Sequence, residues 1–225
     1  MEKTKKLVII GAKEIANMAY EYFTWDSEYE VAAFAVHRQY ITTETFRDLP
    51  VIPLEELINR CPPDDFFCFV AASSEFLNRK RAALYHDIKK EGYRFASYIS
   101  SRAFVWRNVE IGENCFILEN NTLQPFVKIG NNVTLWSGNH IGHQARIADN
   151  CFLTSQVVIS GYVDIGENTF MGVNAAVADN IKIGRDNFIG MGAVVNKTSK
   201  DDQILLGNPA KPSPVSAKTF CSVKE

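Results

Sequence analysis

The stretch from Ile129 to Ser160 reads "IGNNVTLWSGNHIGHQARIADNCFLTSQVVIS", and an aliphatic residue stands at every sixth position of it. The same register continues in both directions without an inserted residue, so that sixteen successive positions carry a branched or long aliphatic side chain. These positions are Val105, Ile111, Ile117, Leu123, Ile129, Leu135, Ile141, Ile147, Leu153, Ile159, Ile165, Met171, Val177, Ile183, Ile189 and Val195. A fixed period of this extent outranks local secondary-structure signals and predicts a repeat architecture.

Each six-residue unit has the composition of a short strand followed by a tight turn. Glycine often follows the aliphatic residue, and asparagine recurs at a turn position that favours left-handed backbone geometry. These asparagines are Asn114, Asn120, Asn132, Asn150, Asn168, Asn174 and Asn180. Three units would close one triangular coil, and about five such coils would stack at the β spacing of about 4.8 Å.

The fifth position of each unit is small or apolar, which predicts a second inward side chain per unit. Cys115 and Cys151 hold this position and are expected to pack in the core. Asn121 and Asn139 hold it one coil apart. We therefore expect their side-chain amides to stack in a ladder like those of cross-β assemblies.

The first hundred residues follow another pattern, in which apolar strand-like runs alternate with helical segments. The sequence predicts strands at 5–12, 29–36, 65–73 and 94–100, helices at 13–23 and 75–93, and a strand with a short helix within 48–57. Strands that alternate with helices imply right-handed crossovers and a mainly parallel sheet. The expected organisation is an α/β Rossmann-like domain at residues 1–100, followed by a parallel β-helix domain with a C-terminal tail at residues 101–225.

The composition excludes several classes of partner. With 24 Lys and Arg against 26 Asp and Glu, the net charge of -2 offers no electrostatic footprint for nucleic acid or an anionic membrane. The apolar run "LVII" is too short for a signal sequence and no long apolar stretch follows, which predicts a cytoplasmic protein without membrane insertion. Five cysteines without CxxC spacing indicate neither a zinc cluster nor a disulfide framework.

The unbroken repeat and the tail "ILLGNPAKP" at 204–212 resemble the left-handed β-helix acyltransferases. Together with the N-terminal "LVIIGA" at 7–12, they make the chain similar to the sialic acid O-acetyltransferase and bacillosamine N-acetyltransferase group. The resemblance covers nearly the whole chain. It implies that the hexapeptide repeats form a left-handed parallel β-helix.

The resemblance also implies an activity. Members of this group transfer an acetyl group from acetyl-CoA to an amino or hydroxyl group of a sugar, which here would be linked to a nucleotide and used in bacterial surface glycan biosynthesis. They are usually homotrimers that bind acetyl-CoA in the groove between neighbouring β-helices. The alternative function is a non-catalytic or weakly active β-helix that serves as a binding scaffold.

Apolar residues at outer positions of the repeat agree with an oligomer. There are more of them than the surface of an isolated β-helix needs, which suggests that another chain covers this face. The alternative is that they pack on the N-terminal half of the same chain. These residues are Phe126, Trp136, Phe152, Val158 and Phe170.

His143 is the candidate catalytic base, because acyl transfer needs a group that accepts a proton from the attacking nucleophile. Its turn position should direct the imidazole outward, and one coil further Gly161 leaves space beside the ring. In the acyltransferase family that this chain resembles, a histidine at this position of "HIGHQARI" is the base, and an acidic residue follows it. Here Gln144 follows, whose amide oxygen could orient the ring without adding charge, so support could also come from Asp164 or another subunit. The alternative is that His143 is only a polar turn residue.

His140 ends the preceding unit between Thr122 and Val158 of the adjacent coils. It could contact substrate or be an isolated surface imidazole. A metal site made by His140 and His143 is a further hypothesis. Because His37 and His86 lie in the other half and no third ligand recurs at a workable spacing, we expect no metal.

The resemblance implies a cofactor site as well. By register, acetyl-CoA would contact Gly161 and the backbone of Val173 and Met191, which are stacked one coil apart. Basic side chains near the last coils could hold its phosphates: Lys182, Arg185, Lys197 and Lys211. Family members often carry a second histidine at the position of Phe152, so that contact is absent here.

Gly11 lies between the first strand and the first helix, where backbone N–H groups can bind an anion, although a simple tight turn is the alternative. In the family resembled, a Gly-His pair here and acidic residues after the second strand bind the nucleotide. Here Lys13 and Glu14 take the place of the Gly-His pair, and the second strand ends in "FAVHRQ", which contains no carboxylate. We expect Gly11, Lys13, Glu14 and His140 to contact the acceptor.

Overall fold

The structure, a computed structural model, describes residues 2–224 and divides into two compact units. The first unit comprises Met1–Ser73 and Ala83–Tyr98, and the second comprises Ser74–Ala82 and Ile99–Glu225. The segment Ser74–Ala82 therefore belongs with the β-helix, although the chain reaches this segment before the first unit is complete.

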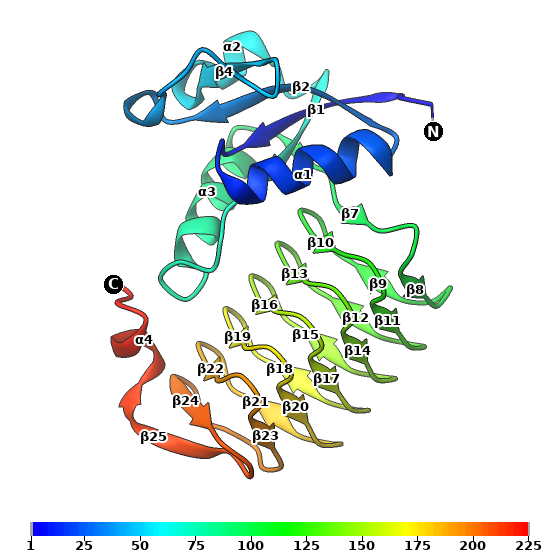
Figure 1. Cartoon of the computed structure of the whole chain (residues 1–225), viewed down its shortest axis with the longest axis vertical. Helices are drawn as coiled ribbons and strands as arrows, with labels where there is room; N and C mark the ends of the chain where they lie inside the picture. Colours follow the sequence, from blue (N-terminus) through cyan, green and yellow to red (C-terminus); the bar gives the residue numbers. More distant parts are fainter. Residues whose placement is uncertain (1, 225) are drawn as a thin grey trace. The chain divides into compact units, whose positions relative to one another are not determined.

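The first unit is built on a six-stranded sheet in the order β3-β4-β2-β1-β5-β6 (Figure 1). Its strands are β1 (Lys5–Ile10), β2 (Tyr29–Val36), β3 (Thr45–Phe46), β4 (Leu49–Pro53), β5 (Phe66–Val70) and β6 (Arg94–Phe95). Its helices are α1 (Glu14–Trp25), α2 (Leu57–Arg60), the 3-10 helices η1 (Arg38–Tyr40) and η2 (Leu54–Glu56), and most of α3 (Arg79–Lys90). Among the described pairings of this sheet, β3 with β4 is antiparallel and the others are parallel. The prediction of a mainly parallel sheet is confirmed.

Helices pack on both faces of this sheet, because side chains of successive strand residues point to opposite sides. On one face, the Phe23 ring of α1 lies 5.0 Å from the Phe69 ring of β5. On the other face, Tyr85 of α3 joins a core cluster with Val8 and Cys68. Burial on both faces explains why β1 ends in a continuous apolar run.

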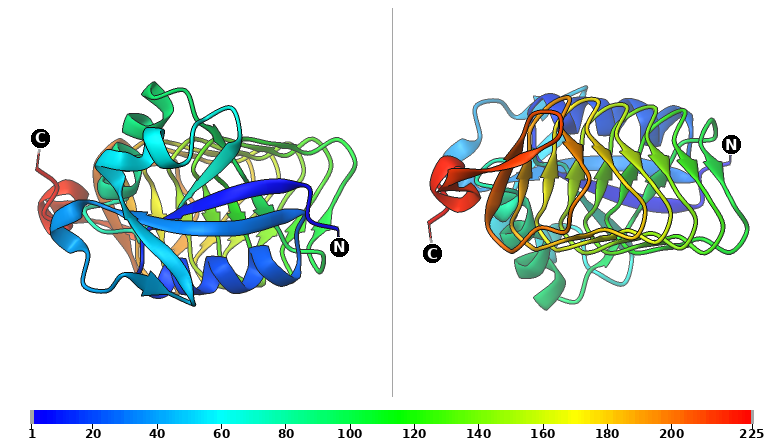
Figure 2. Two further views of the ribbon diagram at one scale, coloured as in Figure 1. Left: turned by 90° about the horizontal axis from the view of Figure 1, so that it is seen from above. Right: turned by 90° about the horizontal axis from the view of Figure 1, so that it is seen from below.

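The second unit is a parallel β-helix in which each hexapeptide contributes one two-residue strand (Figure 2). These strands are β8 (Phe104–Val105), β9 (Glu110–Ile111), β10 (Phe116–Ile117), β11 (Thr122–Leu123), β12 (Lys128–Ile129), β13 (Thr134–Leu135), β14 (His140–Ile141), β15 (Arg146–Ile147), β16 (Phe152–Leu153), β17 (Val158–Ile159), β18 (Asp164–Ile165), β19 (Phe170–Met171), β20 (Ala176–Val177), β21 (Lys182–Ile183), β22 (Phe188–Ile189) and β23 (Val194–Val195). β7 (Tyr98–Ile99) precedes them, and a tail of β24 (Gln203–Leu206), β25 (Lys211–Ser216) and α4 (Ala217–Phe220) follows them.

The strands form three faces. The first face continues into the tail strands and is called the covered face; it consists of β10, β13, β16, β19 and β22. The second face has no Lys, Arg, Asp or Glu in its strands and is called the uncharged face; it consists of β8, β11, β14, β17, β20 and β23. The third face has one such residue in each strand and is called the charged face; it consists of β9, β12, β15, β18 and β21. Strand partners on each face are one coil apart in sequence, as in the pairing of His140 with Thr122 and Val158.

The repeated aliphatic residues form the core of this unit, as predicted. Those from Ile117 to Val195 are at most 4% exposed, and Val105 and Ile111 of the first coil pack against the same cluster. The second inward position is also confirmed, since Cys115 and Cys151 are fully buried. Burial raises the pKa of the Cys151 thiol to about 12, so this cysteine is a packing residue.

The predicted amide ladder of Asn121 and Asn139 is wrong. Both side chains donate instead to backbone carbonyls, including that of Trp136, because an inward amide at a corner faces the carbonyl groups of the turn. A ladder of three amides exists at another position, where Asn114 donates to Asn132 at 2.7 Å and Asn132 donates to Asn150 at 2.8 Å. These turn residues have positive φ angles, as expected for asparagine.

Phe152, one of the apolar residues at outer positions, is covered within this chain. Its side chain is 6% exposed, because the guanidinium of Arg81 lies 5.3 Å above the ring. The Arg81 guanidinium donates to Thr134 Oγ1 at 2.8 Å and to the Asn150 carbonyl at 2.9 Å. Phe152 therefore packs on a segment from the N-terminal half of the sequence, which was the alternative to an oligomer contact.

No helix within residues 2–224 has the length and apolar character needed to cross a membrane.

Candidate functional site

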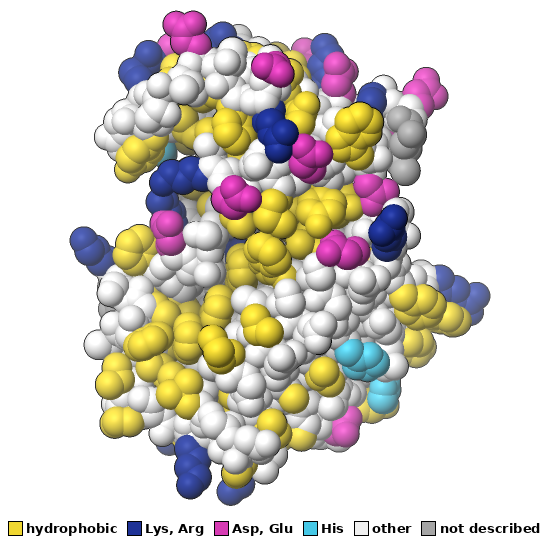
Figure 3. Space-filling view, viewed as in Figure 1, with side chains coloured by type: hydrophobic (Ala, Val, Ile, Leu, Met, Phe, Trp, Pro, Cys, Tyr) yellow, Lys and Arg dark blue, Asp and Glu magenta, His cyan; other side chains and the backbone are white. Residues whose placement is uncertain are grey.

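The turn 142–145 places His143 between the uncharged and the charged face. Gln144 adopts the left-handed conformation of this turn with φ 62°. The His143 N–H donates to Oε1 of Gln124 in the preceding coil at 2.9 Å, which holds the backbone of the turn in place. The His143 side chain is exposed, and histidine side chains lie open at the surface of the β-helix in Figure 3. The imidazole is therefore accessible to a ligand.

Gly161 holds the same turn position one coil further, and the imidazole of His143 lies directly against it. A β-carbon on Gly161 would lie 2.5 Å from Cε1 and 2.9 Å from Nε2 of His143. Gly161 does not adopt a positive φ, so its backbone would accept another residue. Its N–H donates to Oδ1 of Asp179 at 2.9 Å. Glycine is needed here for the space that its missing side chain leaves to the imidazole.

Tyr162 is a neighbour of His143 that the sequence analysis missed. Its ring meets the imidazole edge to face, with centroids 5.1 Å apart and an interplanar angle of 84°. Its N–H also donates to the His143 carbonyl at 3.0 Å. Tyr162 follows Gln144 by one coil, so the register could have placed it here, but only the tertiary structure brings the two rings into contact.

Within residues 2–224, the two residues expected to support His143 make no hydrogen bond to its ring. The Gln144 side chain is exposed, and across residues 2–224 no hydrogen bond joins it to the imidazole. Asp164 lies on the charged face, paired in register with Arg146 and Lys182. Neither residue supplies a partner for the imidazole nitrogens within this chain.

His140 lies on the uncharged face and is half-buried. Its strand neighbours are Thr122 and Val158, as the register predicted. In the part of the chain that the structure describes, no three His, Cys, Asp or Glu side chains form a group that could hold a metal ion. His140 and His143 thus lie near each other without a third ligand.

The residues expected to bind acetyl-CoA fall into separate places. Val173 and Met191 are stacked one coil apart, with the Gly192 N–H donating to the Val173 carbonyl at 2.8 Å, and they are 43% and 81% exposed. They lie at the corner that precedes the uncharged face, whereas Gly161 lies with His143 at the corner that follows it. Lys211 is exposed in β25. One chain alone does not bring these residues into one groove.

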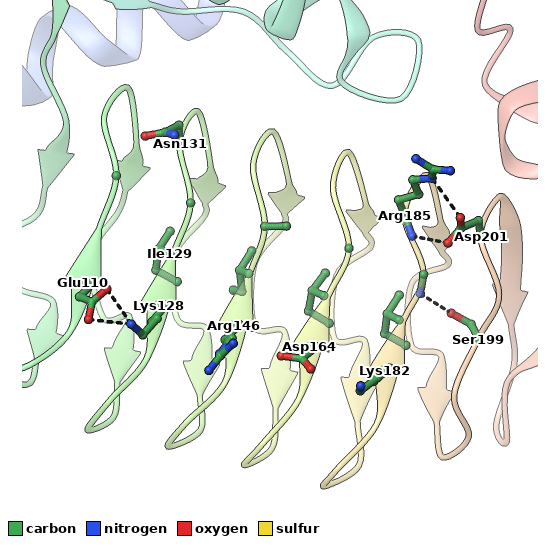
Figure 4. Close-up of a pocket in the computed structure, with 18 of the residues that line it drawn as sticks. Glu110, Lys128, Ile129, Asn131, Arg146, Asp164, Lys182, Arg185, Ser199 and Asp201 are labelled. Carbon is green, nitrogen blue, oxygen red and sulfur yellow. Dashed lines mark hydrogen bonds and ion pairs between the residues drawn. The ribbon is translucent and has the colours of Figure 1, made fainter.

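The charged face is hollowed into a shallow depression of about 940 Å³ (Figure 4). Its outward side chains are Glu110, Lys128, Arg146, Asp164 and Lys182, and Figure 4 shows them in a row that crosses successive strands. Arg185, at the edge of the depression, is paired with Asp201 at 3.0 Å. One of the four basic side chains expected to hold phosphates is therefore already in an ion pair.

In the first unit, Gly11 forms the turn between β1 and α1. It has φ +133°, and a β-carbon on it would lie 2.8 Å from the carbonyl oxygen of Ala71. Both features support the tight-turn interpretation. Lys13 and Glu14 follow with exposed side chains, at the N-cap and first position of α1.

A carboxylate does stand at the end of β2, although the residues that end this strand, "FAVHRQ", contain none. Glu55 of η2 hydrogen-bonds His37 Nδ1 at 3.0 Å and accepts from the Arg38 N–H at 3.1 Å. Hydrogen bonds from its own backbone and from His37 lower the pKa of Glu55. His37 and Glu55 line a cavity of about 260 Å³.

The repeat matches a known family profile. Bacterial transferase hexapeptide (six repeats) matches residues 108–143 and 126–161. Residues 108–161, within the β-helix, are therefore similar to bacterial transferase hexapeptide repeats. No curated protein matches the chain.

Solved structures of hexapeptide transferases are similar to nearly the whole chain. A mutant of perosamine N-acetyltransferase from Caulobacter crescentus, in complex with CoA and GDP-perosamine, has a TM-score of 0.82 at 25% identity, covering 92% of this chain and 96% of that chain. The acetyltransferase domain of PglB from Neisseria gonorrhoeae FA1090 has a TM-score of 0.82 at 22% identity, covering 93% and 100%. WeeI from Acinetobacter baumannii AYE has a TM-score of 0.71 at 21% identity, covering 93% and 100%. The predicted resemblance to hexapeptide-repeat sugar acyltransferases is confirmed.

Proposed function

We propose that this chain is an acetyl-CoA-dependent acetyltransferase that modifies an amino or hydroxyl group of a nucleotide-linked sugar in bacterial surface glycan biosynthesis. The observation that carries the proposal is the exposed imidazole of His143, packed on Gly161 at a corner of the hexapeptide β-helix. The similarity to perosamine N-acetyltransferase, at 25% identity over 92% of this chain, supports this chemistry.

His143 acts as the general base. An imidazole nitrogen accepts a proton from the acceptor amine or hydroxyl while that nitrogen or oxygen attacks the thioester carbonyl carbon. The carbon–sulfur bond then breaks, the acetyl group stays on the acceptor, and the sulfur leaves as a thiol with the proton that His143 returns. Gln144 stands beside the base and contributes the dipole of its amide, without a charge that would stabilise imidazolium.

The acyl donor binds in a groove completed by a second copy of the chain, in a homotrimer of left-handed β-helices. Support comes from the separation of His143 with Gly161 at one corner from Val173 with Met191 at another. The uncharged face between these corners is suited to burial against a neighbouring chain, because no charged side chain would lose its solvent there. Lys211 provides a cation for the donor's phosphates.

The first unit binds the acceptor. Its parallel strands run in the spatial order β4-β2-β1-β5-β6, which matches five strands of a Rossmann-like sheet, and helices cover both faces. Gly11, Lys13 and Glu14 lie at the carboxyl end of β1, where such sheets bind ligands. A cytoplasmic location follows from this choice of substrates.

The test measures free thiol released from acetyl-CoA in the presence of a panel of nucleotide-linked amino sugars. We expect release with at least one acceptor, acetyl-CoA binding by calorimetry, and a trimer by sedimentation. The control is His86→Ala, which removes an exposed imidazole with no proposed role and should leave the rate of thiol release unchanged. Absence of acetyl-CoA binding would contradict the enzyme proposal and favour a scaffold protein.

Replacing Gly161 by alanine should lower kcat about tenfold to a hundredfold while the fold is retained. The new β-carbon would overlap the imidazole, and the exposed His143 side chain would have to swing away from its position. A double-mutant cycle with His143→Ala checks this mechanism, because Gly161→Ala should have no further effect once the imidazole is gone. An equal loss in both backgrounds would show that Gly161 acts independently of His143.

A further inference from the structure

The turn residues of the β-helix show an unusual choice of side chain at the corner that carries His143. Between residues 108 and 195, the described turn residues with positive φ are Asn, Asp, Gln or Gly, except for Phe126 (φ 67°) and Tyr162 (φ 55°). A bulky side chain is disfavoured in this backbone region and persists where a contact or a function requires it. Tyr162 is also 55% exposed, so burial in the core does not explain its presence.

Tyr162 contacts His143 in two ways. Its N–H donates to the His143 carbonyl at 3.0 Å, which fixes the two turns against each other. Its ring then meets the imidazole edge to face at 5.1 Å and 84°, an arrangement that aromatic pairs prefer. No residue in the described range 2–224 hydrogen-bonds to the imidazole nitrogens. The orientation of this exposed ring therefore depends on packing against Gly161 and Tyr162.

We propose that Tyr162 is a positioning residue that acts through His143, an inference that rests on the proposed function. The tyrosine ring limits the rotation of the imidazole and keeps it over Gly161, with its nitrogens free to meet the acceptor. Packing thereby orients the base, because Gln144 follows it in place of an acidic residue and no side chain within residues 2–224 hydrogen-bonds to the ring. Because an unanchored surface imidazole samples several rotamers, the loss of Tyr162 reduces the fraction of molecules that are ready to react.

The test compares Tyr162→Asn with Tyr162→Phe in the full chain. Asparagine suits the left-handed turn and should preserve the fold, but it removes the ring. We expect Tyr162→Asn to lower kcat about tenfold to a hundredfold, with the KM for acetyl-CoA unchanged. Tyr162→Phe keeps the ring and should restore kcat to within about twofold of wild type.

A second readout follows the imidazole itself, independent of activity. The Cε1–H and Cδ2–H resonances of His143, assigned by comparison with His143→Ala, should shift in Tyr162→Asn because the adjacent ring current is lost, and should be retained in Tyr162→Phe. Unchanged resonances in Tyr162→Asn would overturn the proposed contact. Unchanged kcat despite shifted resonances would overturn the positioning role, as would an equal loss of kcat in both variants. Full activity of His143→Ala would instead contradict the proposed function of the base.

Discussion

His143→Ala is expected to lower kcat about a hundredfold to ten thousandfold, the range over which a positioned general base accelerates a reaction. The imidazole is exposed, lies over Gly161 and meets the ring of Tyr162 edge to face. Removal of the ring leaves acetyl-CoA and acceptor bound without a group to take the proton. Steady-state thiol release with the acceptor found in the panel measures the effect.

The matched control is His86→Ala, which removes an exposed imidazole on α3 that has no proposed role in the reaction. The His143 variant should unfold like wild type, because its side chain fills no buried space. Equal rates for wild type and His143→Ala, with acetyl-CoA binding intact, would exclude His143 as the base. Acetyl transfer would then depend on another group at this corner.

Arg81→Ala is expected to lower the free energy of unfolding of the β-helix unit by about 3 kcal/mol. Arg81 is 2% exposed, stacks on Phe152, and donates to Thr134 Oγ1 and to the carbonyls of Asn150 and Cys151. Truncation leaves buried acceptors with fewer donors and opens a cavity beneath the segment Ser74–Ala82. Urea unfolding followed by tryptophan fluorescence measures the change.

Arg81→Met is the matched control, because methionine keeps an apolar stem over Phe152 but needs no burial of charge. Burial lowers the pKa of Arg81 to about 10, which shows that the folded state disfavours the guanidinium charge. The unfavourable free energy of burying the charged guanidinium is fully present below pH 10 and is relieved only as the pH rises above this value. The methionine variant should therefore lose clearly less stability than the alanine variant. An unchanged midpoint for Arg81→Ala would show that the segment Ser74–Ala82 is not held by this side chain.

Much of the candidate site follows from the register of the repeat. His143 and Gly161 are one coil apart in sequence, and the structure places the imidazole on the glycine. The same register puts Val173 beside Met191 and His140 between Thr122 and Val158. Stacking in a β-helix is regular, so position in the repeat is enough to predict neighbours along a corner or a face. The catalytic and binding roles of these residues stay predictions.

Side-chain directions were less predictable. The register also places Tyr162 one coil after Gln144, yet the contact between its ring and His143 depends on the rotamers of two exposed side chains. Asn121 and Asn139 share a repeat position, yet backbone carbonyls capture their amides and the ladder forms at Asn114, Asn132 and Asn150 instead. Equivalent positions guarantee proximity, whereas hydrogen bonding depends on which acceptor lies nearest.

The sequence by itself determined the β-helix, its core and its corners, because the inward residues and turn asparagines recur in one local period and each coil is built like the next. Only the tertiary structure decided which face is covered and which charges meet. Arg81 buries Phe152, and Glu55 brings a carboxylate to the end of β2, where the strand itself has none. These contacts join residues far apart in the chain with no common period. They depend on how unlike elements pack, and a repeat pattern carries no information about that packing.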